Sequence, residues 1–132
     1  MRSLVRHELR RLDGPAFDRC VGERLTERAD GGPTPRARRL SPATLRHRLA
    51  SGAGLLRSPA SRIAFVRRPT GVDLFVDGQR LPLPRRLAFA APLLTGAPQL
   101  GPAALAPHLA RPGFVPLLAD LVNRGAFELA RP

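Results

Sequence analysis

The sequence of 132 residues contains neither tryptophan nor tyrosine, and six phenylalanines supply all of its aromatic side chains. Proteins that bind single strands or flipped bases stack them on aromatic rings, so this composition argues against a stacking platform. Lysine is absent too, although arginine is plentiful. Alanine, proline, glycine and leucine are abundant too. Together with the arginine, this composition is typical of a GC-rich genome. Part of the basic character therefore needs no anionic partner to explain it.

Cysteine occurs once, at Cys20, which excludes a disulfide within the chain and a metal site built from several cysteines. Cys20 falls on the apolar side of an expected helix, so we expect a buried structural thiol rather than a nucleophile. No apolar run approaches the ~20 residues that cross a bilayer. The N-terminal residues also lack the apolar core and cleavage site of a secretory signal. These absences favour a cytoplasmic protein with no membrane partner.

Catalytic motifs are missing as well. The three histidines, His7, His47 and His108, have no acidic residue two positions later, as the iron site of a cupin oxygenase requires. We expect each of them to be a surface or helix-end residue. The serines lie in cap and turn contexts, and no glycine-rich loop for phosphate occurs. The sequence therefore predicts a protein that is not an enzyme and that binds no cofactor.

Positive charge dominates what is present: the formal net charge is +12, from 22 arginines and ten acidic residues. Residues 1–68 hold 16 of the arginines and six of the acids, so the front half carries most of the charge. As nucleic-acid or ribosome contacts, clustered arginines would bind in a salt-sensitive way without reading bases. The alternative, which we favour, is that they are solvated faces. The candidate contacts to an anionic partner are Arg36, Arg38, Arg39, Arg46 and Arg48.

Two short amphipathic helix patterns occupy the first 29 residues, at residues 3–12 and 15–28. Such helices either dock on a partner or pack back onto the rest of the chain, and the pattern leaves both open. Residues 30–40 are rich in glycine, proline and arginine, which indicates a flexible, solvated linker rather than a nucleic-acid arm. The apolar positions that we take as interaction candidates are Leu4, Leu9, Phe17, Val21 and Leu25.

Residues 41–132 have the pattern of a small α+β domain. Ser41-Pro42 opens a helix that extends to about residue 50, because serine caps free N–H groups and proline presets φ. Residues 62–83 predict a three-stranded meander, since Asp77-Gly78 suits a two-residue hairpin turn. The remaining elements are helices at residues 84–96, 102–109 and 114–123 and a strand at residues 126–129. A small antiparallel sheet with three close helices predicts a winged helix.

The helix pattern at residues 114–123 bears on function because it lies where a winged-helix protein places its groove-reading helix. It contains no positive charge, and Asp120 is its one ionised side chain. A helix that lies against phosphates would carry arginine or lysine. We therefore expect this helix to pack in the core.

Several segments resemble a known family. Residues 39–68, followed by LFVDGQRLPLP at residues 74–84, look like the C-terminal part of bacterial JmjC-type cupin proteins. These include the ribosomal-protein arginine hydroxylase group of 2-oxoglutarate oxygenases. In that family a catalytic cupin is followed by a helical dimerisation region and then by a winged helix. Residues 19–33 resemble the end of the helical region, and residues 117–129 resemble the closing helix and strand.

The resemblance implies a helical dimerisation or docking segment at residues 1–29, the linker at residues 30–40 and a winged-helix domain at residues 41–132. The family's cupin, with its His-x-Asp…His iron site, has no counterpart in this sequence, so no catalytic residue carries over. The leading hypothesis is a non-catalytic winged-helix interaction module that forms a homodimer or docks on a cupin oxygenase partner. The alternative is a winged-helix protein that binds nucleic acid through its N-terminal arginine clusters.

Overall fold

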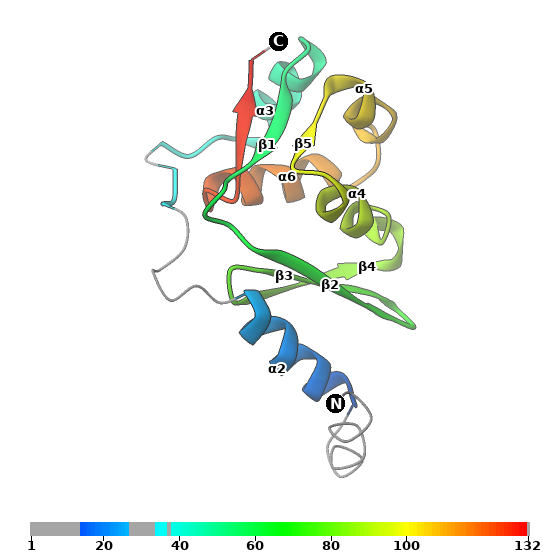
Figure 1. Ribbon diagram of the computed structural model, residues 1–132. Coiled ribbons are helices and arrows are strands. Elements are labelled where there is room, and N and C mark those ends of the chain that lie inside the picture. The colour runs from blue at the N-terminus through cyan, green and yellow to red at the C-terminus, as the bar shows by residue number, and fades with distance from the viewer. Residues whose placement is uncertain (1–13, 27–33, 37, 132) are drawn as a thin grey trace.

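The computed structural model describes residues 14–26, 34–36 and 38–131, with side chains from Arg19 onward (Figure 1). The helix expected at residues 3–12, with Leu4 and Leu9, lies outside the described residues, as does the side chain of Phe17. In chain order the elements are α2 (Gly14–Thr26), α3 (Pro42–Ala50), β1 (Gly54–Arg57), β2 (Ile63–Arg68), β3 (Gly71–Val76), β4 (Gln79–Pro84), the 3-10 helix η2 (Arg85–Leu87), α4 (Ala90–Gly96), β5 (Gln99–Leu100), α5 (Pro102–Leu105), the 3-10 helix η3 (Ala106–His108), α6 (Phe114–Asn123) and β6 (Phe127–Ala130).

The strands form two small antiparallel sheets instead of the one that the sequence predicted. One has the order β5-β1-β6, and the other is the meander β2-β3-β4. Figure 1 shows α2 below the meander and the helices α4 and α6 above it. The closing strand β6 pairs with β1 and not with the meander, so it belongs to the first sheet. Strands β1 and β5 were not predicted, because four and two residues are too few to show alternation.

The hairpin between β3 and β4 confirms the turn that the sequence indicated. Asp77 and Gly78 both have positive φ, at 49° and 85°. A two-residue turn of this kind matches the right-handed twist of the strands that it joins. The carboxylate of Asp77 also accepts hydrogen bonds from the hydroxyl of Ser61 and the backbone N–H of Arg62, each at 2.7 Å. The loop before β2 is therefore tied to the turn.

Helix α6 packs in the core, as its uncharged pattern predicted. Phe114, Leu118 and Leu121 have no exposed surface. Alternate residues of the central strand β3 face the same core, which is why Val72 and Val76 are buried in one cluster with α6. The helix expected at residues 84–96 begins as η2 and becomes an α-helix only at Ala90.

The described part of the segment before α3 is exposed except at Leu40, and it is held to α6 through Asn123. The backbone N–H of Leu40 donates to Oδ1 of Asn123 at 2.7 Å, and its carbonyl accepts from Nδ2 of Asn123 at 3.0 Å. The backbone N–H of Arg36 donates to the carbonyl of Asn123 at 3.0 Å. Leu40 is buried, and one amide side chain satisfies both of its backbone groups, as buried polar groups require. The domain boundaries themselves stay a prediction.

Candidate interaction surface

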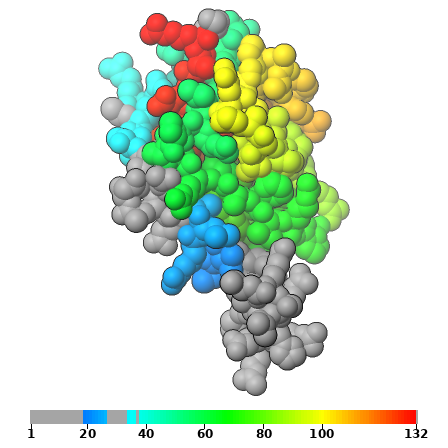
Figure 2. Space-filling model, in the orientation of Figure 1, coloured from blue at the N-terminus to red at the C-terminus, as the bar shows by residue number. Residues whose placement is uncertain are grey.

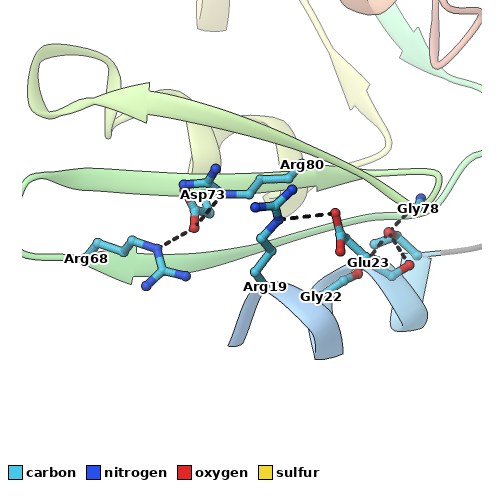
Figure 3. A network of polar contacts seen from close by, with 8 residues as sticks. Arg19, Gly22, Glu23, Arg68, Asp73, Gly78 and Arg80 are labelled. Carbon is cyan, nitrogen blue, oxygen red and sulfur yellow. Dashed lines mark hydrogen bonds and ion pairs between the residues drawn. The ribbon is translucent and has the colours of Figure 1, made fainter. Parts of the chain in front are cut away.

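Helix α2 lies against the meander through its small residues. Gly22 rests on the ring of Phe75, where an added Cβ would come within 2.5 Å of ring carbons. Oγ1 of Thr26 accepts a hydrogen bond from the backbone N–H of Gly78 at 2.8 Å and donates to the carbonyl of Gly22 at 2.9 Å. Figure 3 shows this side of α2 facing β3 and β4. The large apolar side chains of the helix are therefore not needed for this contact.

The apolar side chains that the sequence marked as interaction candidates are exposed where they are described. Val21 is 36% exposed and Leu25 is 64% exposed. Both precede by one position the residues that touch the sheet, which turns them roughly 100° around the helix. Cys20, two positions before Gly22, is exposed as well, so the expectation of a buried thiol is wrong. Helix α2 thus packs back onto the chain and still presents an apolar face.

A hollow of about 690 Å³ opens beside this face, between α2, the end of β1 and the start of β2. Leu56 is 40% exposed in it, and with Val21 and Leu25 it completes the large apolar side chains that the described residues expose. Figure 2 views the molecule from the side on which α2 meets the green residues of the middle of the chain. We call this hollow the α2 groove; its apolar lining is Leu25, Leu56, Pro59, Ile63, Ala64 and Pro98.

Sequence reasoning missed Leu56 because it missed strand β1. Leu55 is fully buried while its neighbour Leu56 faces solvent, as successive residues of a strand point to opposite faces. The alternation of buried and exposed residues was the available signal, but a strand of four residues contains only two periods of it. Charged residues in the groove are both basic: Arg57 and Arg62 line it.

Above α2 in the view of Figure 3, an ion-pair cluster links the three strands of the meander. Asp73 of β3 is 2% exposed, Nε of Arg80 lies 3.0 Å from its Oδ2, and Nε of Arg68 donates to the same oxygen. Burial raises the pKa of Asp73, but the guanidinium groups of Arg80 and Arg68 outweigh it and hold that pKa below its ordinary value. The carboxylate is therefore ionised at neutral pH and serves the sheet rather than catalysis.

The five candidate arginines do not converge on one site. Nη1 of Arg46 donates to the carbonyl of Leu109 at 2.7 Å, which turns Arg46 toward η3. Arg48, two positions along α3, points to another side of the helix and lines a hollow with Arg36. Nε of Arg36 donates to the carbonyl of Arg38 at 2.8 Å.

Arg39 lines a different hollow, between the start of α3 and α6. Among the five, Arg36 thus contacts the backbone of Arg38 and shares a hollow with Arg48, whereas Arg46 and Arg39 lie elsewhere.

The histidines provide no metal site in the part of the chain that the structure describes. His47 is exposed on α3, and His108 stacks on the ring of Phe89 with 4.6 Å between centroids. Within the described ranges, no three or more histidine, cysteine, aspartate or glutamate side chains group as metal ligands. Among those same residues, no helix combines the length and the apolar character that crossing a membrane requires.

The structure has two small antiparallel sheets and three α-helices between β4 and β6, of which the third packs in the core. These features define a winged-helix protein. Residues 10–128 match the model of the ROXA-like winged helix family, and the chain belongs to this family. The predicted fold class and family resemblance are confirmed. Among curated proteins, none matches the chain.

Solved structures of YcfD from Escherichia coli share the fold. One, an X-ray structure, has a TM-score of 0.72 at 22% sequence identity and covers 97% of this chain and 32% of YcfD. Another is described as a ribosomal oxygenase in complex with cobalt and 2-oxoglutarate. It has a TM-score of 0.68 at 24% sequence identity and covers 98% of this chain and 35% of YcfD. The chain therefore spans about a third of the length of the YcfD chains that it matches.

Proposed function

We propose that this chain is a non-catalytic protein-interaction module in which the outward face of α2 packs against a second copy of the chain or against a cupin oxygenase. The observation that carries the proposal is the exposure of Val21 and Leu25 on a helix that is already held to the meander through Gly22. Contiguous exposed apolar side chains mark interaction sites when they do not scatter singly. Here Leu25 adjoins Leu56 across the α2 groove.

The energetics favour docking over mere exposure. Burying a fully exposed leucine side chain contributes about 1.5–3 kcal/mol. Because Leu25 is 64% and Leu56 40% exposed, the two together supply the gain of about one such leucine. The contacts of Gly22 with Phe75 and of Thr26 with Gly78 fix the helix before any partner arrives. A preorganised face loses less conformational entropy on binding than a face that must first order.

The oxygenase-type partner is suggested by the structural neighbours, since YcfD carries this fold in about a third of its chain. The non-catalytic role rests on the sequence, in which no histidine heads the iron motif of a cupin. The described residues supply no competing site, since the one strongly buried carboxylate, Asp73, is occupied by Arg68 and Arg80.

Light scattering after size-exclusion chromatography tests the proposal. Val21→Asp combined with Leu25→Asp introduces two charges on the outward face, and we expect the parent to be a dimer and this variant a monomer with unchanged circular dichroism. The matched control is Ala43→Asp with Ala104→Asp, which adds the same charge at exposed helical positions elsewhere. A dimer that survives in the first variant contradicts docking through α2.

A monomeric parent would exclude self-association and leave the oxygenase partner. Titration of the chain with a purified cupin oxygenase then tests whether the oxygenase is the partner. Binding that is lost with Val21→Asp and Leu25→Asp supports the proposal, and absence of binding refutes it.

A further inference from the structure

Strand β2 is an edge strand of the meander, because the order of that sheet is β2-β3-β4. The N–H of Asp77 donates to the carbonyl of Arg62 at 3.0 Å, and the register continues as Ile63↔Val76 and Phe65↔Leu74. In an antiparallel ladder, hydrogen-bonded pairs alternate with pairs that face outward. The backbone groups of Ile63, Phe65 and Arg67 therefore point away from β3.

These outward groups are open to a further strand. In the ranges that the structure describes, no hydrogen bond from another element reaches the backbone of Ile63, Phe65 or Arg67. Backbone groups that find no protein partner bond to water or to an added chain. Their spacing of two residues is the spacing at which a neighbouring strand pairs.

The start of this edge is also the wall of the α2 groove. Ile63 and Ala64 line the groove together with Leu25 and Leu56. A strand laid along the start of β2 would carry apolar side chains into the groove, beside Leu25 and Leu56. The groove thus supplies apolar contacts where the edge supplies hydrogen bonds.

Charge decides which strand fits. Arg57 and Arg62 line the groove, and exposed Arg67 lies near the far end of β2. Asp77, the carboxylate nearest to Arg62, already accepts hydrogen bonds from Ser61 and from the backbone of Arg62. Pairing of two β2 edges from two copies of the chain would bring like charges together, which destabilises cross-strand pairs. A complementary occupant carries carboxylates instead.

We propose that β2 binds an extended segment of a different polypeptide, apolar in its middle and acidic at its ends, which adds to the meander as a fourth strand. Main-chain hydrogen bonds to residues 63, 65 and 67 supply affinity, and the α2 groove selects the apolar side chains. The inference rests on the proposed role as an interaction module and names the partner chemistry for the edge beside α2.

Fluorescence anisotropy with short labelled peptides tests the proposal on the full chain. The probe has a central run of valine and isoleucine with glutamate at both ends. Its first control is the same peptide N-methylated at alternate residues, which cannot form the ladder. We expect saturable binding by the probe and at least a tenfold loss, about 1.4 kcal/mol, on methylation. No binding, or equal binding by both peptides, overturns the proposal.

Two protein variants test the charge. Arg62→Glu reverses a charge at the groove, and Arg86→Glu reverses an exposed arginine of η2 as the matched control. We expect weaker binding with Arg62→Glu alone and stronger salt dependence for the glutamate peptide than for a glutamine version. Arg57→Glu replaces Arg62→Glu if circular dichroism shows that the latter does not fold. The charge argument is contradicted if neither groove variant weakens peptide binding. It is also contradicted if Arg86→Glu weakens binding as much as the groove variants do.

The same titration separates this inference from the proposed function. Val21 lies outside the lining of the α2 groove, so Val21→Asp should abolish association through α2 and leave peptide binding intact. Amide shifts on peptide addition should concentrate at Ile63, Phe65 and Arg67 in NMR spectra. Shifts confined to α2 would refute strand addition even if the peptide binds.

Discussion

Thr26 connects the C-terminal end of α2 to the hairpin turn, because its Oγ1 accepts a hydrogen bond from the backbone N–H of Gly78 at 2.8 Å. The same hydroxyl donates to the carbonyl of Gly22 at 2.9 Å, so Thr26 is buried with both hydrogen-bonding roles satisfied. The turn beside it is set by the positive φ of Asp77 and Gly78. One side chain therefore joins the first described helix to the part of the meander that the sequence predicted best.

Replacing this hydroxyl by a methyl group should loosen α2. Thr26→Val keeps the shape of the side chain but leaves the N–H of Gly78 without its acceptor, which costs about 1–3 kcal/mol. We expect faster hydrogen exchange at Gly78 and a lower midpoint of urea unfolding. Thr95→Val is the matched control, since Oγ1 of Thr95 bonds only to the carbonyl of Ala91 in its own helix. Equal exchange at Gly78 in both variants would contradict this role.

Gly22 should resist substitution although it lies within a helix. Alanine is favoured over glycine in helices by about 1 kcal/mol, but a Cβ at Gly22 would lie 2.5 Å from the ring of fully buried Phe75. Overpacking of a core costs about 1–3 kcal/mol, so we expect Gly22→Ala to destabilise the chain. In the control, Gly96→Ala, nothing lies within 4 Å of the added Cβ, and the change should be neutral or stabilising. Urea unfolding measures both, and a stabilised Gly22→Ala would disprove the close contact.

Periodic apolar patterns and turn chemistry predicted the elements with local causes. The helix at residues 114–123 has the bounds of α6, and Asp77-Gly78 forms the expected turn. Strands β1 and β5 depend on pairing with residues far along the chain, such as Leu55 with Leu129, so no local window shows them. The bond pair between Leu40 and Asn123 is likewise a contact between distant polar groups.

The interaction surface was predictable in part. Helical spacing identified Val21 and Leu25, which the structure exposes. Which side of α2 meets the sheet was not predictable, because the contact uses Gly22 and an apolar pattern gives glycine no weight. Leu56 was missed with its strand. Cys20 was misplaced because the apolar side of the helix was assumed to be the buried side.

The alternative function, nucleic-acid binding, gives a salt-dependent expectation. Because Arg46 is turned toward Leu109 while Arg36 and Arg48 line another hollow, the arginines do not form one continuous stripe. We expect only weak binding of duplex DNA or single-stranded RNA that disappears at physiological salt. Anisotropy at low and physiological salt measures it. Saturable binding that persists at physiological salt and is lost in Arg36→Ala with Arg48→Ala would favour the alternative.

Asp73 should contribute most of the acid sensitivity of the meander. Its pKa is held below the ordinary value of 3.8 by Arg80 and Arg68 despite its burial. A carboxylate whose folded pKa is depressed stabilises the folded state above its unfolded pKa, and this contribution is lost as pH falls through the folded value. The loss therefore begins near pH 4 and is complete only below the folded pKa.

Asp73→Asn tests this contribution. The amide leaves the charges of Arg68 and Arg80 without their counterion, so we expect a loss of about 2–4 kcal/mol at neutral pH. Asp120→Asn is the control, because Asp120 is 42% exposed and its pair with Arg124 is worth about 0.5 kcal/mol. The stability gap between parent and Asp73→Asn in urea unfolding should narrow as pH falls below 4, since the parent then loses the same ion pair. A gap that stays constant down to pH 2 would show that Asp73 acts through packing rather than charge.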